Sequence, residues 1–146
     1  MFIPLHDANA LKYIKVQYVT ISLIVIDVVV WLVTGLASTQ SFSDAAVVGL
    51  GYIPAVVFDF ADLEPSLVLV PEDATYVTYA FLHGDFMHLA SNMLFLWVFG
   101  DNVEDALGHF RFLVFYLLCA AAGALVHGLV QPDSEAPLIG ASGAIS

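Results

Sequence analysis

The stretch FRFLVFYLLCAAAGALVHGLV, residues 110–130, decides the class of fold. At about 1.5 Å per residue, its 21 residues form a helix long enough to cross the ~30 Å hydrocarbon core of a bilayer. Ala120, Ala124 and Gly128 recur at every fourth position, a spacing that lets helix backbones approach closely in lipid. The stretch therefore predicts a transmembrane helix that packs tightly against neighbouring helices.

The composition of the whole chain also fits a lipid environment. Of its 146 residues, 60% are hydrophobic and 12% are charged. In a soluble domain, about half of the residues are apolar and roughly a quarter are charged. The formal net charge of −11 argues against a nucleic-acid partner, because neutralising phosphates requires clustered Lys and Arg side chains. Cys119 is the one cysteine, so no intrachain disulfide can form.

Two further apolar runs precede this helix. Residues 77–99 are mostly apolar, and residues 18–36 form an apolar run interrupted in its middle by Asp27. The run at 18–36 is longer than the 7–15 residues or so of a signal-peptide core, which favours a retained span. We predict membrane spans at about 18–36, 77–99 and 110–130, with a short polar turn at 100–108.

The remaining segments connect or follow these spans. Residues 37–76 mix acids, prolines and short apolar runs, which favours short helices lying in the membrane interface. The chain stops at Ser146, and residues 141–146 resemble the first turn of a fourth span. We therefore expect 1–146 to be a single incomplete domain, and the chain to be a fragment of a longer protein.

The basic residues predict how the chain is oriented in the membrane. Lys12 and Lys15 precede the first span, and Arg111 lies at the turn between the second and third spans. Two crossings separate these sites, so all three fall on one side, which should be cytoplasmic. The N-terminus is then cytoplasmic, and the segments at 37–76 and 131–137 face outward.

Polar side chains are concentrated at the outer end of the second span. His88 and Asn92 are four residues apart and share a helix face, while His83 lies on a different face or before the helix. Such side chains donate hydrogen bonds either to a developing oxyanion or to neighbouring helices. A zinc site formed with Asp85 is disfavoured, because the histidine spacing is not that of a helical zinc motif.

The segment Gly140-Ala141-Ser142-Gly143 places a serine between glycines at a loop-to-helix junction. Glycine allows a tight turn and close approach of a substrate backbone, and the free N–H groups of a helix start suit an oxyanion. The sequence therefore offers Ser142 as a candidate nucleophile. The alternative is that this run only lets helices pack closely.

Two acidic residues, Asp27 and Glu104, lie within or next to the predicted spans. Asp27 is at the middle of the first span and is expected either to pair with a polar group of a neighbouring span or to be protonated. Glu104 is either a solvated or capping carboxylate or a hydrogen-bond bracket between spans. A weaker hypothesis makes the chain a transporter or channel subunit that uses Asp27 and the histidines.

The order of these features resembles the rhomboid family of intramembrane serine proteases. The resemblance rests on three motifs, His83-x4-His88-x3-Asn92, Trp97-x2-Gly100-x3-Glu104-x3-Gly108 and Gly140-Ala141-Ser142-Gly143. The opening Phe2-Ile3-Pro4-Leu5-His6-Asp7 and the connector motif Ile53-Pro54-Ala55 are similar to bacterial members. The Trp-Arg pair that many members carry in the first connector is absent here.

The resemblance implies a rhomboid-like transmembrane helix bundle, of which this chain would supply about three complete spans and the start of a fourth. It implies that Ser142, between Gly140 and Gly143, is the nucleophile, and that its base is a histidine on the sixth helix, which this chain lacks. His88 and Asn92 would form the oxyanion hole with the Ser142 N–H. No cofactor or metal is implied.

The resemblance also implies supporting roles and a location. His83 would shape the active-site cavity, and Glu104 would tie spans and loops together from the cytoplasmic side. We expect a multi-pass protein of the bacterial inner membrane that cleaves transmembrane substrates near the outer face. The 146 residues alone should be inactive. The alternative is a non-proteolytic rhomboid-like protein that binds transmembrane clients.

Overall fold

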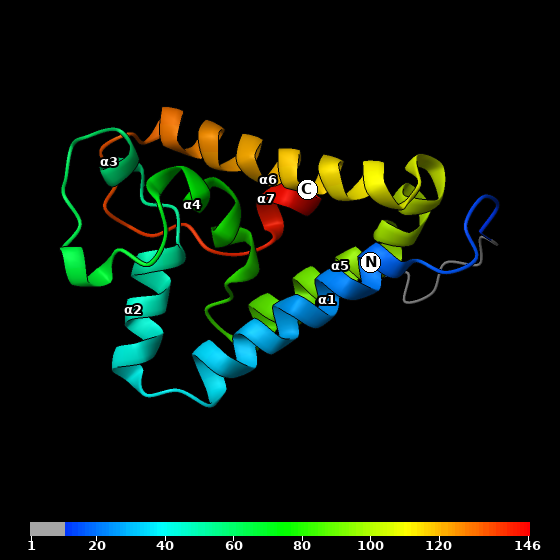
Figure 1. Cartoon of the computed structure of the whole chain (residues 1–146), viewed down its shortest axis with the longest axis horizontal. Coiled ribbons are helices and arrows are strands. Elements are labelled where there is room, and N and C mark those ends of the chain that lie inside the picture. The colour runs from blue at the N-terminus through cyan, green and yellow to red at the C-terminus, as the bar shows by residue number, and fades with distance from the viewer. Residues whose placement is uncertain (1–10) are drawn as a thin grey trace.

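The computed structural model describes residues 11–146, and helices joined by loops make up this part of the chain (Figure 1). The opening motif Phe2–Asp7 lies outside the described residues. The predicted all-α fold is confirmed. The helices are α1 (Tyr18–Trp31), α2 (Gln40–Leu50), α3 (Pro54–Val57), α4 (Glu72–Thr78), α5 (Phe86–Leu107), α6 (His109–Val130) and α7 (Ser142–Ile145).

Helix α1 continues through a π-helical turn at Leu32–Leu36, so the helical segment covers the residues of the first predicted span. Within the described residues, this segment and α6 are the two helices long and apolar enough to cross a membrane. Their outward faces are lined by exposed hydrophobic side chains, as expected of surfaces that face lipid. These include Val25 and Val29 on α1, Val33 and Leu36 in the π-helical turn, and Leu118, Val126, Leu129 and Val130 on α6.

The second long helix differs from the span predicted at 77–99. Helix α5 begins at Phe86, where the Asp85 carboxylate accepts a hydrogen bond from the His88 N–H (2.8 Å) and caps the helix. It ends at Leu107, because Gly108 with φ of 78° supplies the left-handed backbone that terminates it. The polar turn predicted at 100–108 is wrong, because residues 100–107 are the last two turns of α5 and Gly108 ends the helix. Polarity marks where a helix leaves lipid, whereas capping residues mark where it stops.

The small residues of α6 allow the close packing that their spacing predicted. Ala120, Ala124 and Gly128 are buried, and the Tyr79 hydroxyl donates a hydrogen bond to the Ala120 carbonyl (2.9 Å). A Cβ at Gly128 would lie 2.2 Å from the Tyr52 hydroxyl, so a larger residue would displace the tyrosine. These three small residues thus leave a groove on α6 into which the buried Tyr52 and Tyr79 side chains pack.

The connector between α1 and α5 folds against the loop that leads to α7. Tyr52 and Leu138 exchange two backbone hydrogen bonds (3.1 and 2.8 Å), and the Ala55 N–H donates to the Ser134 carbonyl (3.0 Å). The buried Tyr52 side chain anchors the connector to α6, where burial and then the nearby Tyr76 raise the pKa of its hydroxyl. These contacts hold the connector in place without a Trp-Arg pair.

The ends of the bundle separate the connector from the basic residues (Figure 1). The start of α1 lies at the same end as the turn between α5 and α6, and α2, α3 and α4 lie at the opposite end. The Lys12 N–H donates to the Asp105 carboxylate (2.9 Å), which places the first basic residue beside the turn that precedes Arg111. The bases therefore share one end, as the sequence predicted.

Candidate active site

The loop before α7 presents Ser142 through one glycine with an unusual backbone. Gly140 has φ of 113°, a conformation that residues with a Cβ rarely adopt, and its N–H donates to the Tyr79 carbonyl (2.9 Å). Ala141 is fully buried, whereas the Ser142 side chain that follows it is exposed. The loop is therefore pinned at Gly140 and Ala141 and turns Ser142 outward.

The imidazole of His88 lies directly against Gly140. A Cβ at position 140 would be 2.5 Å from His88 Nε2 and 3.6 Å from Asn92 Nδ2. Only glycine leaves room for the His88 ring next to the loop, whereas the distance to Asn92 would be an ordinary contact. His88 and Asn92, from the first two turns of α5, thus lie beside the segment that carries Ser142.

Asn92 presents a free donor at this place. Its side chain is buried, and Nδ2 has no hydrogen-bond partner among the described residues. A cavity of about 450 Å³ is shared by Asn92 and Ser142, and is completed by Ser91, Phe95, Ile145 and Ser146. An unpaired amide donor is costly to bury, so its retention beside a serine points to a ligand oxygen that it can bind.

His83 lies in the loop before α5, not on the helix. Its Nε2 accepts a long hydrogen bond from the Ala141 N–H (3.5 Å), and its ring packs edge-on against His88 with centroids 5.1 Å apart. His83 is buried, so it supports the loop and the neighbouring ring rather than facing the cavity.

The histidines do not assemble with Asp85 around a metal position. The Asp85 carboxylate caps α5, as described above, and is exposed. Within residues 11–146 no group of three or more His, Cys, Asp or Glu side chains is arranged to hold a metal ion.

Gly143 allows α7 to lie close to α6. A Cβ at position 143 would be 2.3 Å from the Tyr79 hydroxyl, and a Cβ at Gly123 would be 3.0 Å from the Gly143 carbonyl oxygen. The two glycines face each other across the interface, and Tyr79 fills the space beside them. Gly143 is thus a packing residue that sets the position of α7.

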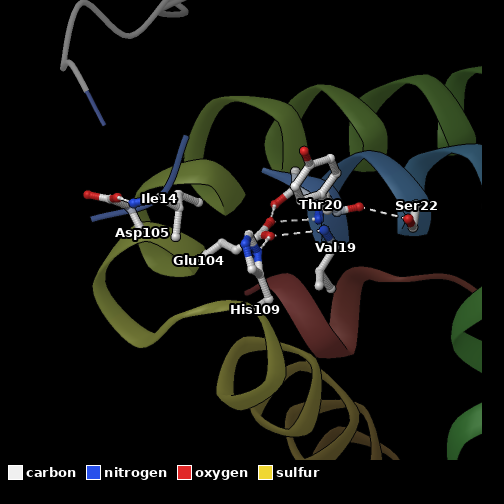
Figure 2. A network of polar contacts seen from close by, with 8 residues as sticks. Ile14, Val19, Thr20, Ser22, Glu104, Asp105 and His109 are labelled. Atoms are coloured by element: carbon white, nitrogen blue, oxygen red, sulfur yellow. Dashed lines mark hydrogen bonds and ion pairs between the residues drawn. The ribbon is translucent and has the colours of Figure 1, made fainter. Parts of the chain in front are cut away.

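Glu104 forms the hydrogen-bond bracket between helices that was one of the two predictions for it (Figure 2). Its buried carboxylate accepts from the Val19 N–H (2.9 Å), the Thr20 N–H (2.8 Å) and the Thr20 hydroxyl (2.7 Å), at the start of α1. His109 Nδ1 lies 2.5 Å from Glu104 Oε1, the oxygen that also accepts from the Val19 N–H. One carboxylate from α5 therefore caps α1 and reaches the first residue of α6.

Comparison with known proteins agrees with this architecture. The rhomboid domain family profile matches residues 72–146, which is just over half of the chain. The chain belongs to the rhomboid family. As a rhomboid, it is an integral membrane protein, in keeping with its two candidate spans.

Individual rhomboid relatives match over parts of their length. Rhomboid-like protein 11, chloroplastic, of Arabidopsis thaliana is 41% identical over 70 residues, which are 48% of this chain and 25% of the relative. Rhomboid protease GluP of Bacillus subtilis is 38% identical over 86 residues, 59% of this chain and 16% of the relative. Rhomboid protease GlpG of Klebsiella pneumoniae is 31% identical over 91 residues, 62% and 31% of the two chains.

The rhomboid chain thus spans less than a third of the length of these relatives. No solved structure gave a significant match. The matched region contains all the candidate site residues described above, from His83 to Gly143.

Sequence reasoning missed three residues that hold the rhomboid site and its bracket. Tyr79 bonds both the Gly140 N–H and the Ala120 carbonyl, yet in sequence it is an ordinary tyrosine in an apolar run. Asp105 accepts backbone N–H bonds from Lys12, Tyr13 and Ile14 (2.7–2.9 Å). His109 contacts Glu104. If residues 100–107 had been predicted as helix, Glu104 and Asp105 would have been placed together near the end of that helix.

Proposed function

We propose that this chain is part of an intramembrane serine endopeptidase that cleaves transmembrane proteins near the outer face of the membrane. The observation that carries the proposal is the unpaired, buried amide nitrogen of Asn92 on the cavity shared with Ser142, with His88 against the same loop. The relatives named rhomboid protease support this class of reaction.

The proposed reaction uses Ser142 as nucleophile. Its hydroxyl oxygen attacks the carbonyl carbon of the scissile peptide bond, and the carbonyl oxygen becomes a tetrahedral oxyanion. Asn92 Nδ2, a protonated ring nitrogen of His88 and the Ser142 N–H donate hydrogen bonds to that oxyanion. A base takes the hydroxyl proton and gives it to the nitrogen of the leaving amine as the intermediate collapses to an acyl-enzyme. Water then hydrolyses the acyl-enzyme, and the base transfers the proton of the water to the oxygen of Ser142.

A serine hydroxyl needs a base to accept its proton. Among residues 11–146, no side chain is hydrogen-bonded to the Ser142 hydroxyl, and His83 Nε2 is engaged by the Ala141 N–H. We therefore propose that the base is a histidine outside the 146 residues and that these residues alone do not cleave substrates. Without that base, a rhomboid-like protein that binds transmembrane clients is the alternative.

The proposed orientation places Lys12, Lys15 and Arg111 in the cytoplasm. Their shared end of the bundle is the observation that supports it, since basic residues collect on the cytoplasmic side. The connector and the loop before α7 then face outward, and so does the entrance to the Ser142 cavity. The bacterial relatives GluP and GlpG support placement in a bacterial inner membrane.

A fluorophosphonate probe distinguishes the protease from the client-binding alternative. In the protein expressed from its complete reading frame and reconstituted in vesicles, we expect covalent labelling at Ser142, identified by peptide mass spectrometry. The probe reacts only with a serine whose proton a base removes. Absence of labelling at Ser142 in correctly folded protein would favour the non-proteolytic function.

Replacement of Asn92 by alanine should remove one oxyanion donor. We expect kcat for a transmembrane substrate to fall by about 10²–10³-fold with a small change in KM, because the lost bond forms mainly in the transition state. Ser91→Ala is the matched control, since Ser91 lines the same cavity but its hydroxyl donates to the His88 carbonyl (3.0 Å). Equal activity of the two variants would remove Asn92 from the oxyanion hole.

A further inference from the structure

Four buried polar atoms, on three separate segments, have no hydrogen-bond partner within residues 11–146. They are both carboxylate oxygens of Asp27 on α1, Nδ1 of His83 before α5 and the hydroxyl of Tyr116 on α6. His83 Nδ1 is 4.0 Å from Asp27 Oδ1, and both side chains are fully buried. Tyr116 also interacts electrostatically with Asp27.

These atoms complement one another as donors and acceptors. A carboxyl group keeps at least one acceptor oxygen whether or not it is protonated, and a tyrosine hydroxyl offers one donor. A separation of 4.0 Å exceeds a hydrogen bond by roughly 1 Å, which small side-chain rotations can close. Because a buried polar group without a partner destabilises the fold, pairing Asp27 with His83 and Tyr116 is favoured over leaving all three unpaired.

The contacts on the other side of His83 determine which nitrogen carries its proton. Nε2 accepts a hydrogen bond from the Ala141 N–H, so Nε2 must have a free lone pair. A neutral imidazole then carries its hydrogen on Nδ1, the nitrogen that faces Asp27. An acceptor at Asp27 and a donor at Ala141 therefore require the same tautomer.

We propose that Asp27 is a positioning residue for the Ser142 loop, which it holds by fixing the tautomer of His83. With Nδ1–H directed to Asp27, Nε2 remains an acceptor for the Ala141 N–H, the residue next to Ser142. Without an acceptor at position 27, the imidazole can carry its hydrogen on Nε2. Two donors, Nε2–H and the Ala141 N–H, then point at each other, and the hydrogen bond between them is lost. The link between Asp27 and catalysis rests on the proposed function, whereas the tautomer does not.

Solid-state NMR of protein with ¹⁵N-labelled histidine measures the tautomer directly. The protein is expressed from its complete reading frame and reconstituted in vesicles at neutral pH. The His83 signals are assigned by their loss in His83→Gln. We expect Nδ1 protonated and Nε2 unprotonated in the native protein and in Asp27→Asn, whose amide oxygen remains an acceptor, and a mixture of tautomers in Asp27→Leu.

Thr34→Val is the matched control, because it also removes a polar group from the first span, where the Thr34 hydroxyl bonds the Val30 carbonyl (2.8 Å). This variant should keep the native tautomer. The inference is overturned if native His83 carries its hydrogen on Nε2, or if folded Asp27→Leu keeps the native tautomer. The native spectrum decides even if Asp27→Leu does not fold.

Fluorophosphonate labelling then tests the link to Ser142. We expect the labelling rate to fall about tenfold in Asp27→Leu and to stay within about twofold of native in Asp27→Asn and Thr34→Val. Equal rates in Asp27→Leu and the native protein would overturn the positioning role. A native protein that is not labelled contradicts the proposed protease instead, and the NMR result still decides whether Asp27 fixes the tautomer.

Discussion

Replacing Ser142 with alanine is expected to lower the rate of substrate cleavage by at least about 10⁴-fold in the protein expressed from its complete reading frame. The reason is that the hydroxyl oxygen forms the covalent bond to the substrate, and no neighbouring group replaces it. Oxyanion donors and substrate binding would remain, so the variant should still bind substrates. Cleavage of a transmembrane substrate in vesicles, followed over hours, measures the effect.

Ser146→Ala is the matched control for this experiment. Ser146 is exposed, lines the same cavity and lies four residues further along, where its hydroxyl donates to the Ser142 carbonyl (2.5 Å). We expect its cleavage rate to stay within about threefold of native, because the bond that it loses is an exposed one. A Ser142→Ala protein that cleaves as fast as Ser146→Ala would disprove the nucleophile assignment.

Replacing Glu104 with alanine is expected to destabilise the fold by about 3–5 kcal/mol. The substitution leaves the N–H groups of Val19 and Thr20 and the Thr20 hydroxyl without their acceptor at a buried helix start, and frees His109 as well. Thermal unfolding of the detergent-solubilised protein should show a large drop in Tm.

Glu135→Ala provides the comparison for the Glu104 variant, because Glu135 is an exposed glutamate in the loop after α6. Its free energy of unfolding should change by less than about 0.5 kcal/mol. The stability of Glu104→Gln should lie between those of the two alanine variants. Its amide oxygen can accept one or two of the hydrogen bonds, but its NH₂ group faces other donors. If Glu104→Ala unfolds at the same temperature as Glu135→Ala, the bracket does not stabilise the bundle.

The limits of prediction are clearest in α5. The apolar run at 77–99 predicted that a span crosses this region, but hydropathy measures preference for lipid and not the position of a cap. Asp85 and Gly108 set the ends of the helix, and the segment before Asp85 is a 3₁₀ turn and loop that carries His83. His83 was predicted as lying either on a different helix face or before the helix, and the structure decides for the loop.

In the candidate site, too, the sequence predicts some features and the structure alone shows others. Each of its residues is visible in the sequence, because a histidine or an asparagine in an apolar span and a serine between glycines are unusual enough to be noticed. Their mutual arrangement is not visible. The approach of His88 to Gly140 depends on the φ of Gly140 and on Tyr79, whose role no local pattern announces.

The sequence by itself determined that this protein is a bundle of helices in lipid, and that Ser142, His88 and Asn92 are its chemically distinctive residues. It did so because the cost of polar groups in lipid makes every retained one conspicuous. Only the tertiary structure decided where α5 begins and ends, that Glu104 caps α1, and that Asp27 faces His83. Those facts depend on contacts between residues far apart in the chain, and the direction of a side chain across a packed interface is a property of the whole bundle.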